Sequence, residues 1–118
     1  MVEQEDRVFA ALADATRRRL LATLARGSPL TTTQLVRAFP ISRQGIVKHL
    51  ALLAQAGLVQ AQTKGREKQY VLEPHSLQPA SAWIEAVGRQ WEERLQRLQH
   101  LVEKDDGAAP DVNQTKNR

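Results

Sequence analysis

The chain has 118 residues, of which 42% are hydrophobic and only 4% aromatic, with a formal net charge of +4 and no cysteine. This length suits one domain with one modest core, and the lack of cysteine excludes disulfides, thiolate metal sites and thiol redox sensing. No apolar run approaches the roughly 20 residues that span a bilayer, and the N-terminus lacks the apolar core of a signal peptide, so we expect a soluble, cytoplasmic protein without a membrane partner.

The charged residues are distributed unevenly along the chain. Between Ala15 and Arg66 there are nine Arg or Lys residues and no Asp or Glu, whereas all thirteen acidic residues lie at Asp14 or before it, or at Glu67 or beyond. A segment without acidic residues does not repel phosphates, so this distribution favours a long polyanion as partner. We therefore expect the protein to bind double-stranded DNA.

A short helix is predicted over residues 4–13. Val8, Phe9 and Leu12 fall on one side of it. Asp14 is the predicted N-cap of the next helix, because its carboxylate can accept hydrogen bonds from the free N–H groups of a first turn. The chain is thus expected to begin with two helices in close succession.

The second helix is predicted to end at Gly27, two residues before Pro29. Its leucines at core spacing are Leu20, Leu21 and Leu24. The three consecutive arginines at 17–19 cannot share one direction, since neighbours on a helix differ by 100°. We expect at least one of them to face solvent or a phosphate, and the pairing of another with a nearby carboxylate stays open.

Two short helices are predicted to follow, joined at a proline. Thr31 and Gln34 have the spacing of a capping box, and the helix that they begin must end near Phe39 because Pro40 follows. Ser42 is the predicted N-cap of the fourth helix. The linker of residues 40–42 has the turn length of a DNA-binding helix-turn-helix.

The fourth helix has two distinct faces at 100° per residue. Its core side comprises Ile46, His49, Leu50 and Leu53, and its outer side comprises Arg43, Gln44, Val47, Lys48 and Ala51. Arg43 has the donors for a guanine edge, Gln44 for an adenine, and Val47 can contact a thymine methyl. Gly45 lacks a side chain and would permit close approach to the DNA backbone. The competing interpretation is an ordinary solvated helix face.

The period of the pattern changes after Gly57. The segments 58–63 and 68–72 are predicted to be strands around a turn at 64–66. The basic side chains at the tip suit phosphate or minor-groove contact, although they would also serve a tip that only improves solubility. The complete set expected to contact DNA is Thr32, Thr33, Ser42, Arg43, Gln44, Gly45, Val47, Lys48, Lys64, Arg66 and Lys68.

A long helix is predicted to begin between Ser76 and Ala80 and to continue to about Lys104. Its apolar residues form one continuous stripe: Leu77, Ala80, Ile84, Val87, Trp91, Leu95, Leu98 and Val102. A stripe of this length exceeds what a small domain can cover, so we expect it to form a two-fold homodimer. The expected interface is Val8, Phe9, Leu12, Trp83, Ile84, Val87, Trp91, Leu95 and Leu98.

These elements together predict a mainly α fold with a small β-hairpin: a winged helix-turn-helix with a long C-terminal dimerisation helix. We expect residues 1–104 to form one DNA-binding and dimerisation domain. Residues 105–118, which are rich in Gly, Pro, Asn and Asp, are expected to be a disordered tail.

Three motifs in order give the chain a family resemblance. The run Leu12–Arg18 resembles the "LADPTRR" opening of ArsR-type winged-helix regulators, and the segment from Ser42 to Val59 resembles their recognition segment. Gly65–Tyr70 followed by Trp91–Leu95 is similar to a cysteine-free branch of that family. The resemblance covers about residues 6–104 and implies a dimeric repressor that dimerises through its first and last helices. Val47 stands where the family usually has Ser, so the family's base preference does not transfer.

The metal sensing associated with this family is not expected here. The resemblance would place one metal site around Gln34, where the chain has no cysteine. His100 and Glu103 match half of the other family site, but the positions matching its first half are Val87 and Arg89, which cannot bind a metal. We therefore expect no metal site and no cofactor, and the sequence identifies no inducer.

Three classes of function remain on the sequence alone. The first is a sequence-specific DNA-binding repressor that recognises a palindromic operator through its recognition helix and wing. The second is a winged-helix interaction module that binds an acidic protein partner. An enzyme is the weakest of the three, because no nucleophile–base pair, acidic dyad or phosphate-binding loop occurs, so the protein is not expected to be an enzyme.

Overall fold

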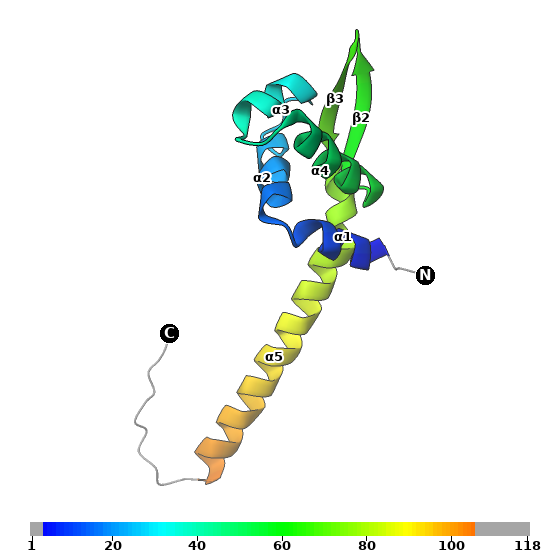
Figure 1. Cartoon of the computed structure of the whole chain (residues 1–118). Helices are drawn as coiled ribbons and strands as arrows, with labels where there is room; N and C mark the ends of the chain where they lie inside the picture. Colours follow the sequence, from blue (N-terminus) through cyan, green and yellow to red (C-terminus); the bar gives the residue numbers. More distant parts are fainter. Residues whose placement is uncertain (1–3, 106–118) are drawn as a thin grey trace. The chain divides into compact units, whose positions relative to one another are not determined.

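The computed structural model describes the backbone of residues 4–105 and the side chains of residues 4–104. In chain order the elements are α1 (Gln4–Leu12), α2 (Ala15–Leu24), β1 (Leu30–Thr31), α3 (Thr32–Ala38), α4 (Arg43–Gln55), β2 (Val59–Lys64), β3 (Glu67–Leu72), the 3-10 helix η1 (Pro74–Leu77) and α5 (Gln78–Asp105) (Figure 1). This order confirms the predicted fold class, a mostly helical winged helix-turn-helix with a long last helix. Of the disordered tail expected over residues 105–118, Asp105 still belongs to α5, and residues 106–118 lie outside the described residues.

The described chain divides into two compact units between Ala82 and Trp83. The first unit contains every element up to η1 and the first residues of α5. The second contains the rest of α5, which is one continuous helix of 28 residues. None of the helices in residues 4–105 is both long enough and apolar enough to cross a membrane.

The three described strands form one antiparallel sheet in the order β1-β3-β2. Leu30 pairs with Tyr70 and Thr31 with Gln69, so β1 adds a third strand to the predicted hairpin. Its two residues are too few to show the alternation by which a strand is predicted. Thr31 also caps α3, so the chain passes from sheet to helix without a linker.

The wing is a tight hairpin of β2 and β3, in which Val59 pairs with Leu72 and Lys64 with Glu67. Its turn is formed by Gly65 and Arg66 alone, one residue shorter than predicted, because Lys64 is still part of β2. Gly65 has φ 63°, and no other residue type among residues 4–105 has a positive φ. A positive φ at the first central residue only is the pattern of a type II′ turn, which favours glycine there.

The core of the first unit is formed by apolar side chains from its helices and its sheet. The buried apolar residues are Val8, Ala11, Leu20, Leu21, Leu24, Leu35, Ile46, Leu50, Leu53, Ala56, Leu58, Val59, Tyr70 and Ala80. They include the predicted core positions of α2 and, on α4, Ile46, Leu50 and Leu53; His49, predicted on the same side, is only partly buried. Val8 is 0% exposed, so its assignment to a dimer interface is wrong: a side chain enclosed by its own core cannot reach a second protomer.

The predicted N-caps are all confirmed. The Asp14 carboxylate accepts from the Arg17 backbone N–H, and the Ser42 hydroxyl accepts from that of Gly45. Thr31 and Gln34 form the complete capping box. Each of these side chains satisfies N–H groups that a helix leaves without partners at its start.

The arginines at the start of α2 have a different role from the one considered in the sequence. Arg17 donates from Nε to the Ala11 carbonyl at 2.7 Å and from Nη2 to that of Ala10 at 3.3 Å. Arg18 donates to the Leu12 carbonyl at 2.6 Å. These carbonyls end α1 and lack partners within the helix. The two guanidinium groups therefore cap the C-terminus of α1, where positive charge is also favourable.

The recognition helix α4 is joined to the wing through backbone hydrogen bonds. Gly57, with φ 78°, donates to the Ala54 carbonyl at 2.9 Å, and Leu58 donates to that of Leu53 at 2.9 Å. This pair of bonds is a Schellman motif, which needs a left-handed residue at the position of Gly57. The Leu58 carbonyl in turn accepts from the Glu73 N–H at 2.8 Å, just beyond β3.

Candidate nucleic-acid interface

The helix-turn-helix consists of α3 and α4, with residues 39–42 between them. On α4, Ile46, Leu50 and Leu53 are fully buried. The opposite face is exposed and comprises Arg43, Gln44, Val47 and Lys48. The two faces predicted from helical periodicity are therefore present, and the outer one presents hydrogen-bond donors at both ends and one apolar side chain between them.

One side-chain bond connects the two helices of the motif. Arg43 donates from Nη2 to Thr33 Oγ1 at 2.8 Å, which orients the guanidinium at the start of α4. Periodicity could not predict this bond, because it depends on the turn that brings α3 and α4 together. Thr32 differs from its neighbour: its exposure is only 8%. Its side chain therefore offers little surface to DNA, and its expected contact stays a prediction.

The packing of the protein itself explains why position 45 is a glycine. A Cβ at this position would lie 2.6 Å from the Ile41 Cγ2 methyl. The turn before α4 therefore packs against the helix where a side chain would begin. The sequence alone indicates close approach to DNA as the reason for this glycine. The packing against Ile41 is sufficient to explain it, and close approach to DNA stays a prediction.

The basic residues of the wing tip are Lys64, Arg66 and Lys68, and all three are exposed. Lys64 lies opposite Glu67 and Lys68 lies opposite Thr63. Residues directly opposite each other share a face of the ribbon, and successive residues alternate between faces. Lys64 and Lys68 therefore project from opposite faces of the wing. The exposed Glu67 shares its face with Lys64 and offsets that charge, so the net positive charge of the tip comes from Lys68 and from Arg66 in the turn.

Behind the outer face, His49 links α4 to the start of α2. Its Nδ1 lies 3.3 Å from Arg17 Nη1 and 3.9 Å from Asp14 Oδ2. The Arg17 backbone N–H lowers the pKa of the Asp14 carboxyl, and the charges of His49 and Arg17 lower it further against the opposing effect of burial. The sequence predicted the cap at Asp14 but not this junction, which depends on tertiary contacts.

The apolar stripe of α5 remains exposed beyond Ala82. Its members and the neighbouring Trp83 are between 41% and 57% exposed over the range expected at an interface: Trp83, Ile84, Val87, Trp91, Leu95 and Leu98. Phe9 and Leu12 on α1 are half-buried. An exposed apolar surface of this kind typically marks an interaction site.

No group of three or more His, Asp or Glu side chains that could hold a metal ion occurs in the described part of the chain. His100 and Glu103, the half-motif noted in the sequence, lie on the exposed last turns of α5.

Comparison with known proteins agrees with this geometry. A family model described as a helix-turn-helix domain matches residues 12–60. The HTH-type transcriptional regulator Rv2034 of Mycobacterium tuberculosis is 36% identical over 98 residues, which make up 83% of this chain and 88% of that protein. The transcriptional repressor SdpR of Bacillus subtilis is 35% identical over 77 residues, covering 65% of this chain and 84% of that protein.

Among solved structures, the ArsR-like transcriptional regulator from Rhodococcus sp. RHA1 superposes with a TM-score of 0.71 at 35% identity, covering 83% of this chain and 92% of that one. The fold, the exposed face of α4 and the wing define a winged helix-turn-helix regulator of transcription that binds DNA. The chain belongs to the ArsR family of these regulators, as its motifs indicated. Its relatives are named transcriptional regulators, and this protein is likewise a regulator and not an enzyme.

Proposed function

We propose that the protein is a homodimeric repressor that binds a palindromic operator through α4 and the wing. The observation that supports this most directly is the exposed face of α4, with Arg43, Gln44 and Lys48, together with the exposed basic side chains of the wing tip. No acidic residue lies between Ala15 and Arg66, so the face of α4 has no acidic side chain of its own segment to repel phosphates, and Glu67 beside Lys64 is the one acidic residue of the wing.

Each exposed side chain of α4 has a chemical role in this proposal. Arg43 donates two parallel bonds to a guanine edge, Gln44 pairs with an adenine, and Val47 contacts a thymine methyl. Lys48 and the wing tip contact phosphates, which position the protein without selecting a sequence. The DNA backbone approaches the start of α4 in this proposal, where it meets Thr33, Ser42 and Gly45.

The dimer forms, in this proposal, through the apolar stripe of α5 with Phe9 and Leu12 of α1. A two-fold axis would place two recognition helices one turn of DNA apart, about 34–36 Å, and this spacing demands a palindromic site. Residues 1–104 act as one domain, consistent with α5 being continuous across Ala82 and Trp83. We assign the protein to the cytoplasm, where such an operator would lie.

The test is selection of bound sequences from random duplex DNA with the purified chain. We expect enrichment of one inverted repeat, with half-sites about one helical turn apart. A double variant, Arg43→Ala with Gln44→Ala, should lose that enrichment, whereas Arg26→Ala, which removes one positive charge outside the proposed contact surface, should retain it. Binding without any sequence preference would overturn the proposal and favour the alternative of a basic module for an acidic protein partner.

A further inference from the structure

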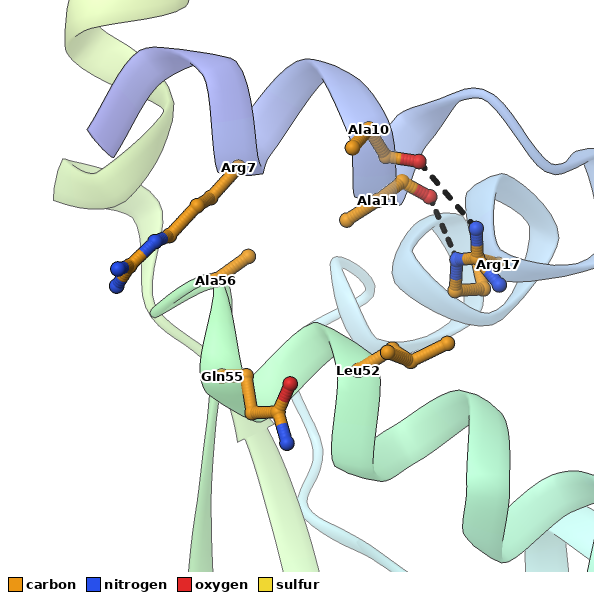
Figure 2. Close-up of a pocket in the computed structure, with 7 residues that line it drawn as sticks. All are labelled: Arg7, Ala10, Ala11, Arg17, Leu52, Gln55 and Ala56. Atoms are coloured by element: carbon orange, nitrogen blue, oxygen red, sulfur yellow. Dashed lines mark hydrogen bonds between the residues drawn. The ribbon is translucent and has the colours of Figure 1, made fainter. Parts of the chain in front are cut away.

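A surface pocket of about 510 Å³ lies between α1, α2 and α4 in the first unit (Figure 2). Ala11, Leu52 and Ala56 supply its apolar surface, and Arg7 and Arg17 lie at opposite ends of it. Leu52 is 39% exposed, so its side chain is accessible to a ligand in the pocket. The volume falls within the range of about 300–1,000 Å³ typical of small-molecule sites.

The charges around the pocket select the kind of ligand. The side chains that line it in the described part of the chain include two arginines and the Gln55 amide, and no Asp or Glu. A guanidinium has five N–H donors, and Arg17 uses three of them in bonds to Ala10, Ala11 and His49. Two donors of Arg17 and all those of Arg7 can therefore serve an anion, whose apolar body would cover Leu52.

The pocket is directly connected to the recognition helix. Leu52 and Gln55 belong to the C-terminal end of α4, and Ala56 is its C-cap. Arg17 bonds the end of α1 on one side and lies 3.3 Å from His49 of α4 on the other. An anion that draws the Arg17 guanidinium toward itself competes with these bonds, and so changes how α4 is held against α1 and α2.

The pocket is also separate from the proposed dimer contact on α1. At 100° per residue, Arg7 and Ala11 lie on one side of this helix, and Phe9 and Leu12 lie on the opposite side. A second protomer that packs on Phe9 and Leu12 would leave the pocket side of α1 open.

We propose that this pocket binds a small organic anion, a carboxylate or sulfonate on an apolar body, and that the bound anion lowers affinity for DNA. The second part rests on the proposed function, and the first does not. The ligand is held by ion pairing with Arg7 and Arg17 and by burial of its apolar part on Leu52. This gives the regulator an inducer site that needs neither cysteine nor a metal ion.

The test uses 8-anilinonaphthalene-1-sulfonate as probe and the full-length protein without DNA. We expect saturable binding of one probe per chain, with an affinity reduced about tenfold or more in Arg7→Glu. The neutral analogue N-phenyl-1-naphthylamine should bind more weakly than the sulfonate to the wild type. Arg19→Glu, an equal change of charge at an exposed position of α2 outside the pocket, should bind the probe as the wild type does.

A second variant guards against binding elsewhere. Leu52→Glu places a negative charge in the lining of the pocket on a partly exposed position, so it should fold and should reject the sulfonate. Probe binding that survives both Arg7→Glu and Leu52→Glu but is lost in Trp91→Glu would locate the probe on α5 and overturn the proposal.

The link to DNA is tested separately, with the operator obtained by selection. Saturating probe should weaken operator binding by the wild type and leave binding by Arg7→Glu unchanged. An occupied pocket with unchanged operator affinity would overturn the regulatory part alone. Failure to select any operator would contradict the proposed function, and the probe titration would still decide whether the anion site exists.

Discussion

In the proposed complex, single residues of α4 separate the recognition of sequence from the attraction to phosphate. Arg43→Ala would remove the proposed bidentate contact to one base, so we expect a loss of about 1–3 kcal/mol on the selected operator and a relaxed preference at one position. Lys48→Ala would remove the proposed phosphate contact. It should weaken binding to all duplexes and reduce the slope of log affinity against log salt by about 0.9.

Competition binding at several salt concentrations, with operators changed at one base each, measures both effects. The two variants are controls for each other, because each removes one positive charge from the same exposed face. Equal losses of specificity in both would contradict the division of roles.

Asp14 gives the protein a testable dependence on pH. Hydrogen bonding to the Arg17 N–H lowers the pKa of this carboxyl in the folded state. The pKa of Asp14 is thus lower in the folded state than in the unfolded state, where it is about 3.9. The charged carboxylate therefore stabilises the folded state fully above the unfolded pKa. This stabilisation is lost as the pH falls through the lower pKa of the folded state.

Asp14→Asn keeps an N-capping side chain but removes the charge. We expect the variant to have a lower Tm than the wild type near pH 7, and the difference in Tm to shrink as the pH falls below about 4. Thermal unfolding followed by circular dichroism from pH 7 to pH 3 measures this difference. A constant difference over that range would show that the charge of Asp14 is not the cause.

At the scale of the element, two glycines in helices should respond in opposite ways to the same substitution. Gly45→Ala places a methyl 2.6 Å from Ile41 Cγ2, and β-branched side chains such as Ile have few alternative rotamers. Overpacking of this kind costs about 1–3 kcal/mol, which exceeds the gain in helix propensity of about 1 kcal/mol.

Gly88→Ala in α5 is the matched control, since its methyl would meet no atom within 4 Å. It should be neutral or raise the free energy of unfolding by up to about 1 kcal/mol. Urea denaturation of the two variants gives the comparison. A rise in the unfolding midpoint for Gly45→Ala would mean that the turn yields freely and that its packing is not the reason for the glycine.

The elements that could be predicted from the sequence are those with local signals. The caps at Asp14, Thr31 and Ser42 act on N–H groups within three residues, and the faces of α4 follow from its periodicity. β1 could not be predicted, because Leu30 and Thr31 become a strand only by pairing with β3. The Arg43–Thr33 bond and the contacts of Arg17 with the end of α1 could not be predicted either, because they depend on how the helices pack together.

At the scale of the whole molecule, the exposed stripe of α5 should determine the oligomeric state. We expect the wild type to sediment as a dimer at micromolar concentration. Trp91 is 57% exposed in the single chain. Its replacement would remove a large apolar contact from the proposed dimer interface. Trp91→Glu should therefore be monomeric and should not bind the palindromic site.

Gln96→Glu is the matched control, because it adds the same charge on the side of α5 away from the stripe. It should remain dimeric and bind DNA as the wild type does. Circular dichroism of Trp91→Glu would distinguish a folded monomer from an unfolded chain. If the wild type sediments as a monomer, the dimer proposal is wrong, and the exposed stripe would have to bind a different protein partner.

The backbone bonds of Leu58 have a consequence for the shape of DNA that the protein accepts. Through its N–H and its carbonyl, this one residue joins the end of α4 to the chain leaving the wing. We therefore expect the helix and the wing to adjust together, and not separately, to grooves of different width. Sequences that alter the width of the minor groove beside the half-site, such as runs of A·T pairs, should change affinity even where no side chain contacts a base. The two backbone bonds of Leu58 thus lead us to expect that duplex geometry itself contributes to what the protein recognises.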